Sequence, residues 1–322
     1  MTKQKCLVVG LGNIGMKYDL DLEFEEFVLT HCAAISGHDD FILSGGVDIN
    51  KKNRDIFVDT YSSPAFDNIG SAIKEVRPSV GVICCPTNDH YAALISLVES
   101  QDIKAILCEK PLSYDIVEAQ EMVNICAKYD VPLYVNYMRR ADPNVVEIKR
   151  RITSGEIAGP IKVSAWYSKG LLNNGSHLVD LASYWLGDYI SHKLLNCERH
   201  WNKTDPEPDV YIQFEKGSLV LMSAWEEFYT HFTVELLSRS GRLYYSNGGE
   251  KISFNQAGED DLFKGYKVLA DKPEIFKNHF LKYQYHVYDQ LSEALQKRKS
   301  NLCDGFNGLS TLEILGNICG DL

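Results

Sequence analysis

Cys6-Leu-Val-Val-Gly10-Leu-Gly12-Asn13-Ile14-Gly15 sets the architecture of this chain, because an apolar segment of strand length runs directly into three spaced glycines. In a Gly-x-Gly-x-x-Gly turn the first glycine allows a tight turn and the second lets backbone amides approach a pyrophosphate. The third allows a helix to pack closely on the strand. The anion then lies at a helix amino terminus, where the helix dipole favours negative charge. We therefore predict a dinucleotide site at Gly10, Gly12, Asn13, Ile14 and Gly15.

Apolar segments of strand length alternate with amphipathic segments of helix length through the first part of the chain. Strands are expected at residues 6–9, 41–47, 80–85, 105–108 and 133–135, and helices at 68–75, 90–99 and 114–129. This βαβ alternation predicts an α/β fold with a doubly wound parallel sheet and right-handed crossovers. An acidic, aromatic segment at residues 16–30 delays the first helix, which we expect to resume at 30–36.

The pattern changes after residue 135. Helices are expected at residues 143–154 and 175–185, strands at 161–167, 210–214, 218–224, 230–237 and 241–245, and helices again at 276–298 and 306–319. Consecutive strands joined by short turns pair antiparallel. We therefore predict a dinucleotide-binding domain at residues 1–133. An α+β domain with a large open, mainly antiparallel sheet is predicted at 134–322.

Composition excludes several classes of protein. The formal net charge of −11 over 322 residues argues against nucleic acid as a partner. Nine cysteines without a Cys-x-x-Cys spacing indicate neither a disulfide framework nor a metal site. The first residues run straight into a strand, leaving no room for a signal peptide, and no apolar run approaches the ~20 residues of a membrane span. We expect a soluble protein of the cytoplasm with no membrane partner.

Asp48 ends the second predicted strand, where a carboxylate accepts hydrogen bonds from the adenosine ribose. A carboxylate at this place repels a 2′-phosphate, which favours NAD as the cofactor. The basic residues Lys51, Lys52 and Arg54 follow shortly and keep NADP as the alternative.

Two further strands end in polar residues that face the ligand crevice of an open α/β sheet. After the strand at 80–85 come Pro86, Thr87, Asn88 and His90, of which Thr87 and Asn88 are candidates for the nicotinamide side. Capping of the next helix by Asn88 is an equal alternative. After the strand at 105–108 come Glu109, Lys110 and Pro111.

Lys110 is costly to desolvate at such a strand end, and partial burial moves a lysine pKa down towards values useful for proton transfer. The alternative is a solvated lysine that merely begins a loop.

A second polar cluster follows the strand at 161–167. Asn173 and His177 are four residues apart and His177 and Asp180 three apart, so a helix would place them on one face. A histidine among polar neighbours exchanges a proton near neutral pH. The alternative is a helix start capped by Ser176, with His177 exposed at the surface.

Five motifs follow one another along the chain: Gly10-x-Gly12-x-x-Gly15, Pro86-Thr87-Asn88-x-His90, Glu109-Lys110-Pro111, Asn136-Tyr-Met-Arg139-Arg-Ala-Asp-Pro143 and Gly175-Ser-His177-Leu-Val-Asp180. Together they resemble the glucose–fructose oxidoreductase / inositol 2-dehydrogenase (Gfo/Idh/MocA) family over essentially the whole chain. The resemblance implies a Rossmann domain followed by an α+β domain whose open sheet forms homodimers or homotetramers.

The resemblance also implies roles for individual residues. Lys110 and His177 become the proton-handling pair for a sugar carbinol, while Asn173, Arg139 and Asp180 contact substrate. The cofactor contacts are Gly10, Gly12, Asn13, Ile14, Gly15, Asp48, Pro86, Thr87, Asn88, His90, Glu109 and Lys110. Asn173 departs from the aspartate common in the family, and its motif resembles a subgroup that acts on nucleotide sugars. The competing hypothesis is a dinucleotide-binding regulator without turnover.

Overall fold

The computed structural model describes residues 3–100 and 102–322, which form two compact units. The first unit comprises Met1–Ala141 and Leu281–Leu312, and the second comprises Asp142–Phe280 and Glu313–Leu322. The division predicted at residues 133 and 134 therefore changes in two ways. Residues up to Ala141 stay with the first unit, and a carboxy-terminal segment returns to it, because Val287, Tyr288 and Leu291 share a buried core with its sheet.

The first unit is built on one sheet. Its described strands are β1 (Gln4–Val9), β2 (Phe41–Val47), β3 (Ala65–Phe66), β4 (Val80–Ile83), β5 (Ala105–Cys108), β6 (Leu133–Val135) and β16 (Cys303–Asp304). They lie in the order β16-β6-β5-β4-β1-β2-β3, and every neighbouring pair is parallel except β16 with β6. The predicted parallel sheet is confirmed, with a short antiparallel edge that the sequence did not indicate.

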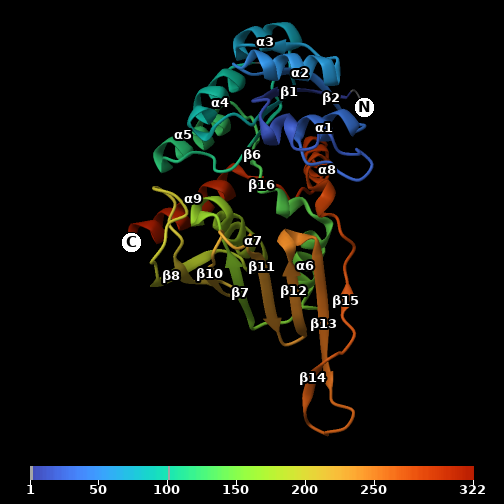
Figure 1. Cartoon of the computed structure of the whole chain (residues 1–322), viewed down its shortest axis with the longest axis vertical. Coiled ribbons are helices and arrows are strands. Elements are labelled where there is room, and N and C mark those ends of the chain that lie inside the picture. The colour runs from blue at the N-terminus through green and yellow to red at the C-terminus, as the bar shows by residue number, and fades with distance from the viewer. Residues whose placement is uncertain (1–2, 101) are drawn as a thin grey trace. The chain divides into compact units, whose positions relative to one another are not determined.

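Helices cover both faces of this sheet (Figure 1). They are α1 (His31–Gly37), α2 (Lys51–Tyr61), α3 (Ile69–Val76), α4 (His90–Val98), α5 (Ile116–Lys128), α8 (Tyr283–Leu295) and the first part of α9 (Gly305–Gly320). Side chains of α3, α4 and α5 pack with Leu7 and Val9, whereas those of α1, α2 and α8 pack with Cys6 and Val8. Successive strand residues point to opposite faces, so a strand buried on both sides reads as a continuous apolar run.

The first helix is delayed, as the acidic, aromatic segment predicts. The glycine turn leads into a single π-helical turn, η1 (Asn13–Lys17), and α1 begins only at His31. Thr30 caps α1, its hydroxyl accepting a hydrogen bond from the amide of Ala33 at 3.2 Å. Asp19 in turn accepts from the Thr30 hydroxyl at 2.7 Å, which fixes the start of the helix. The tail helix α8 starts at Tyr283, later than the predicted residue 276.

The second unit contains the larger sheet. Its described strands are β7 (Ile161–Tyr167), β8 (Tyr189–Asn196), β9 (Asp209–Phe214), β10 (Gly217–Ser223), β11 (Phe232–Ser238), β12 (Gly241–Ser246), β13 (Lys251–Glu259), β14 (Lys267–Leu269) and β15 (Glu274–Ile275). The order is β14-β13-β12-β11-β7-β10-β9-β8, with β15 beside β13. All pairs are antiparallel except β7 with β10, which confirms a mainly antiparallel sheet.

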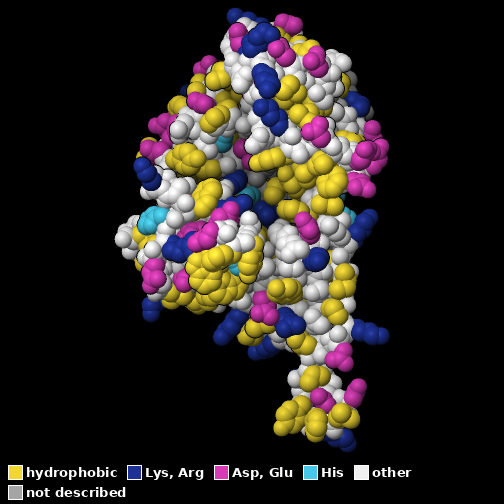
Figure 2. Space-filling model, in the orientation of Figure 1, with side chains coloured by type: hydrophobic (Ala, Val, Ile, Leu, Met, Phe, Trp, Pro, Cys, Tyr) yellow, Lys and Arg dark blue, Asp and Glu magenta, His cyan; other side chains and the backbone are white. Residues whose placement is uncertain are grey.

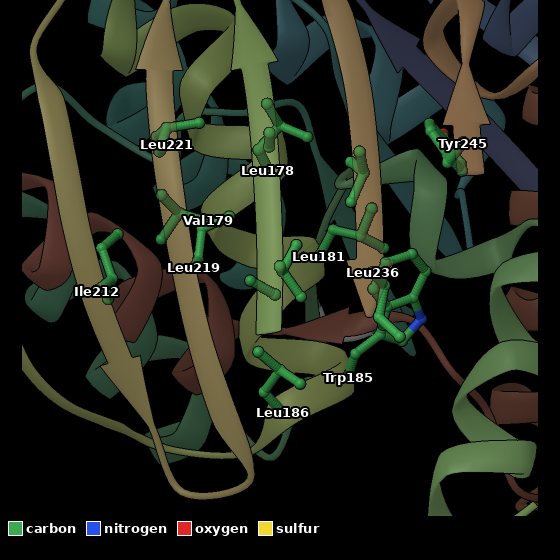
Figure 3. Close-up of a cluster of buried hydrophobic side chains, with 14 of the residues drawn as sticks. Leu178, Val179, Leu181, Trp185, Leu186, Ile212, Leu219, Leu221, Leu236 and Tyr245 are labelled. Carbon is green, nitrogen blue, oxygen red and sulfur yellow. The ribbon is translucent and has the colours of Figure 1, made fainter. Parts of the chain in front are cut away.

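One face of this sheet is covered by helices α6 (Pro143–Ser154) and α7 (Ser176–Leu186), together with the end of α9. Figure 3 shows Leu178, Leu181 and Trp185 of α7 among strand side chains such as Leu219 and Leu236. The strands alternate between buried and partly exposed residues, as expected for a sheet with one open face.

Strands β13 and β14 form a hairpin that extends beyond the rest of the second unit's sheet. Hydrophobic side chains gather at its tip (Figure 2), where Leu262 is 84% exposed and Tyr266 is 69% exposed. Among the helices of residues 3–100 and 102–322, none has the length and apolar character needed to cross a membrane.

Candidate functional site

The carboxyl ends of neighbouring strands in the first unit bring most of the predicted residues to one edge. Along the order β6-β5-β4-β1-β2, these strands are followed by Asn136, Glu109–Lys110, Pro86–Thr87, the glycine turn and Asp48. In open α/β sheets this is the edge where ligands bind. The remaining candidates, Asn173, His177 and Asp180, belong to the second unit.

The three glycines differ in what surrounds them. Gly10 has a φ of +101°, and a Cβ there would lie 2.5 Å from the backbone of Cys84. A Cβ on Gly15 would lie 2.1 Å from the carbonyl oxygen of Gly10. Gly12 has nothing within 4 Å of its Cβ position. The backbone contacts of the turn therefore require glycine at positions 10 and 15. Gly12 instead leaves open space beside the backbone, which fits a pyrophosphate.

Asp48 is held in place at the end of β2. One carboxylate oxygen accepts hydrogen bonds from the amide of Leu11 and the side chain of Asn53, both at 2.9 Å, and the other accepts from the amide of Asn50 at 2.7 Å. Arg54, one of the cations considered for a 2′-phosphate, donates instead to the carbonyl oxygen of Asp48 at 2.7 Å. A carboxylate rather than a cation therefore stands beside the glycine turn, which fits NAD.

The structure contradicts the alternative prediction that Asn88, in the segment after β4, caps the next helix. Thr87–Asp89 forms a short 3-10 turn, and the N-cap of α4 is Asp89. Asn88 is exposed and does not cap the helix. His90 is buried, with its ring nitrogens 3.0 Å from the carbonyl oxygen of Cys85 and 3.1 Å from that of Pro111. His90 therefore joins the loops after β4 and β5, and its contact with a cofactor stays a prediction.

Three hydrogen-bond partners surround the carboxylate of Glu109. His31 Nε2 lies 2.9 Å from its Oε1, Asn136 Nδ2 donates to the same oxygen at 2.6 Å, and the amide of Lys110 lies 3.3 Å from Oε2. Burial opposes a charge on Glu109, but the bonds from His31 and Asn136 and the positive charge of Lys110 outweigh it. They lower the pKa of Glu109 below its usual value. Lys110 itself is partly buried rather than fully solvated.

Arg139 lies in a short 3-10 turn, η3 (Met138–Ala141), which follows β6 after Asn136 and Tyr137. It is buried in the first unit, and its positive charge lies near Tyr283 of α8. Asn136 precedes this turn and is also buried. The motif around Arg139 is therefore part of the first unit, and its predicted contact with substrate is not yet tested.

The second unit carries Asn173 in a π-helical turn, η4 (Gly170–Gly175), and His177 and Asp180 in α7. His177 is 7% exposed and Asp180 is 1% exposed. The Ser176 hydroxyl donates to the carbonyl oxygen of Asn173 at 2.7 Å, and Ser176 is not the N-cap. The alternative of a surface histidine behind a serine cap is therefore wrong.

Two buried carboxylates that the sequence did not reveal hold this turn. Asp205 accepts from the amides of Leu172 at 2.8 Å and Asn173 at 3.1 Å, while Glu207 accepts from the amide of Gly170 at 3.1 Å. Carboxylates stabilise the unpaired amides that begin a helix. The only sequence signal was a pair of acidic residues in a Pro-containing loop, Asp205-Pro-Glu207-Pro208.

Known proteins resemble this chain along its length. Residues 4–137 match the Gfo/Idh/MocA model, described as an oxidoreductase family with an NAD-binding Rossmann fold. Myo-inositol 2-dehydrogenase of Thermotoga maritima is 26% identical over 266 residues, which cover 74% of this chain and 74% of that protein.

Solved structures agree with the fold. A putative NADPH-dependent oxidoreductase of Desulfitobacterium hafniense has a TM-score of 0.82 at 13% identity, covering 100% of this chain and 96% of the other. The WlbA dehydrogenase of Bordetella pertussis, solved with NADH and UDP-GlcNAcA, has a TM-score of 0.75 at 16% identity, covering 99% and 95%.

Proposed function

The chain belongs to the Gfo/Idh/MocA oxidoreductases, and on that premise we propose that it is an NAD-dependent sugar or nucleotide-sugar dehydrogenase. It would interconvert a carbinol and the corresponding ketone. When bound, NAD supplies the acceptor or donor of the hydride. The glycine turn from Gly10 to Gly15 and Asp48 would hold it, with Pro86, Thr87, Asn88, His90 and Glu109 as further proposed contacts.

Proton handling is proposed for two residues. Lys110 takes the proton from the hydroxyl oxygen of the substrate during oxidation, or returns it during reduction, and His177 is the second residue proposed to handle protons. Asn173, Asp180 and Arg139 are proposed to bind substrate hydroxyl or charged groups. Asn173 forms hydrogen bonds but holds no charge. Glu109 supplies a negative charge next to Lys110.

The observation that carries this proposal is the row of strand ends in the first unit. Lys110 follows β5, two strands from the glycine turn after β1. The strand between them, β4, is followed by the loop that contains Pro86 and Thr87. The proposed cofactor site and a lysine whose charge acts on the carboxylate of Glu109 thus share one edge of one sheet. A regulator would not need the lysine, and none of the relatives named above suggests that alternative.

The substrate class rests on the relatives. One acts on an inositol and one was solved with a nucleotide sugar. The test is to incubate the purified protein with NAD⁺ and a panel of inositols, hexoses and nucleotide sugars, and to follow the absorbance of NADH. Lys110→Ala should lower kcat about a thousandfold. The exposed Lys104→Ala, at the opposite end of β5, is the control and should leave kcat unchanged. Full activity of Lys110→Ala would refute the proposed role, and NADH binding without any turnover would favour a regulator.

We further propose that the open face of the second unit's sheet joins copies of this chain in a homodimer or homotetramer. Support comes from large side chains on that face, with Trp166 at 43%, Leu237 at 47% and Tyr244 at 45% exposure. Trp166→Glu should lower the mass found by sedimentation equilibrium to that of a monomer. Trp225→Glu, in a loop off the sheet and 55% exposed, should not.

We also propose the cytoplasm as the compartment, which the nine free cysteine thiols support.

A further inference from the structure

A closed ring of hydrogen bonds lies behind Lys110 in the first unit. Its members are Glu109, His31, Gln284 and Asn136, from the end of β5, the start of α1, helix α8 and the end of β6. His31 and Gln284 are fully buried and Asn136 is 3% exposed. Residues far apart in the sequence therefore meet around one carboxylate.

The direction of each bond in the ring follows from donor chemistry. Gln284 Nε2 lies 2.7 Å from His31 Nδ1 and 3.1 Å from Nε2. An amide nitrogen only donates, and Nε2 faces the carboxylate of Glu109, so we assign Nδ1 as the acceptor. The hydroxyl of Tyr288, 3.0 Å from Nδ1, donates to the same atom. The imidazole proton is then on Nε2, from which it is donated to Glu109.

Asn136 closes the ring as a double donor. Its Nδ2 donates to Glu109 at 2.6 Å and to Gln284 Oε1 at 3.3 Å. Among the described residues its Oδ1 has no hydrogen-bond partner. Reversing the amide would place an oxygen 2.6 Å from a carboxylate oxygen, which is repulsive. The hydrogen bond to Glu109 therefore fixes the orientation of the Asn136 amide, although it leaves Oδ1 unsatisfied among the described residues.

We propose that His31 is a positioning residue that, with Gln284 and Asn136, keeps Glu109 ionised beside Lys110 and thereby sets the charge state of Lys110. The role rests on the proposed function of Lys110. The attraction between Glu109 and Lys110 is mutual, so the carboxylate favours the ammonium form of the lysine. Without His31, Glu109 loses one of the interactions that lower its pKa, and its influence on Lys110 weakens.

Other titratable groups around Glu109 do not interfere near neutral pH. Burial above all, and to a lesser degree the charge of Glu109, raises the pKa of two thiols and two phenols, namely Cys84, Cys108, Tyr283 and Tyr288. These four groups stay neutral. Asp19 and Arg139 act on Tyr283 with opposite sign. His31 and Lys110 are the two ionisable side chains with which the proposal is concerned.

The test measures the titration of Lys110 directly, by competitive acetylation of the apoprotein at a series of pH values and mass spectrometry of the Lys110 peptide. Glu109→Gln should move the titration midpoint down by about one pH unit, and His31→Leu should move it in the same direction by a smaller amount, because Asn136 still donates to Glu109. His31→Gln carries an amide nitrogen near the Nε2 position and should leave the midpoint near that of the wild type. If His31→Leu does not fold, His31→Asn replaces it, because its shorter amide does not reach Glu109.

The matched control is His38→Leu. His38 is also buried in the first unit beside a carboxylate, with Nε2 3.3 Å from Asp289, but it is not part of the ring. It should leave the midpoint of Lys110 unchanged. A wild-type midpoint in both His31→Leu and His31→Asn, with a shifted midpoint in Glu109→Gln, would overturn the role of His31.

Kinetics give the second readout. With a substrate in hand, the acidic limb of the pH profile of kcat/KM should move to lower pH in Glu109→Gln and His31→Leu by the amount measured for the lysine, and should stay in place in His31→Gln. The acetylation result does not depend on turnover. The two experiments therefore distinguish two outcomes: that Lys110 has no catalytic role, and that the hydrogen-bonded ring does not influence the titration of Lys110.

Discussion

In the first unit the candidate residues lie at the carboxyl ends of adjacent strands. In the second unit they lie in the turn η4 and in helix α7, and a loop about 30 residues further along the chain binds the backbone of that turn. The strand ends after β1, β2, β4, β5 and β6 are positioned by the backbone pairing of the sheet. Residues 170–175 are positioned by the carboxylates of Asp205 and Glu207. A backbone scaffold tolerates side-chain changes, while a scaffold made of two buried carboxylates does not.

This comparison leads to different expectations for substitutions in the two units. All four tryptophans, Trp166, Trp185, Trp201 and Trp225, belong to the second unit. Tryptophan fluorescence therefore reports unfolding of that unit, and hydrogen exchange of β1 and β4 peptides reports the first.

The largest effect is expected for Gly10→Ala. Its Cβ would meet the backbone of Cys84 at 2.5 Å, in a conformation with φ +101° that alanine rarely adopts. We expect a loss of about 4 kcal/mol in the unfolding free energy of the first unit, seen as faster hydrogen exchange in β1 and β4. Gly12→Ala is the control, since its Cβ meets nothing within 4 Å. Equal exchange in both variants would show that the turn is not held by backbone contact.

A slightly smaller loss is expected for Asp205→Ala. It leaves the amides of Leu172 and Asn173 without their acceptor, which costs about 3 kcal/mol for two bonds to a buried charge. Urea unfolding followed by tryptophan fluorescence should show a lower midpoint. The exposed Asp261→Ala should unfold as the wild type does. An unchanged midpoint in Asp205→Ala would mean that η4 is held by packing rather than by the carboxylate.

Gly12→Ala should change binding and leave stability intact. A methyl group in the open space beside the turn interferes with the approach of a pyrophosphate to the backbone. We expect about tenfold weaker NADH binding, or 1.4 kcal/mol, by fluorescence titration. Unaltered affinity would place the pyrophosphate elsewhere.

The smallest effect concerns pH. Burial opposes a charge on Asp289, but hydrogen bonds from His286 and His38 outweigh it and lower its pKa to about 2. The resulting stability is present above the ordinary pKa of 3.8 and is lost as the pH falls through 2. Asp289 is 44% exposed, so we expect Asp289→Asn to lose only about 1 kcal/mol at pH 7.

Urea titrations of the first unit at pH 7, 4 and 2 check this expectation. The difference between wild type and Asp289→Asn should persist at pH 4 and shrink towards pH 2. Asp55→Asn, which breaks an exposed pair with Lys51, is the control and should show little difference at any pH. A constant difference for Asp289→Asn would assign its effect to something other than its charge.

Most strands were predictable because their signals are local. The strands at Phe41–Val47 and Ala105–Cys108, and helix Pro143–Ser154, have the predicted bounds, since apolar periodicity and a capping aspartate mark them within a few residues. Strand β8 and the β13–β14 hairpin were missed. They are largely exposed, so they carry little apolar pattern.

The glycine spacing and the polar residues after each strand were enough to predict a dinucleotide fold and the residues along its edge, because a strand end is a local feature. The contacts of His31 and Gln284 with Glu109, of Asp205 with the turn at Asn173, and the return of α8 to the first unit became visible only in the folded chain. They join residues far apart in sequence, and buried polar groups find partners through three-dimensional packing that no period in the sequence records.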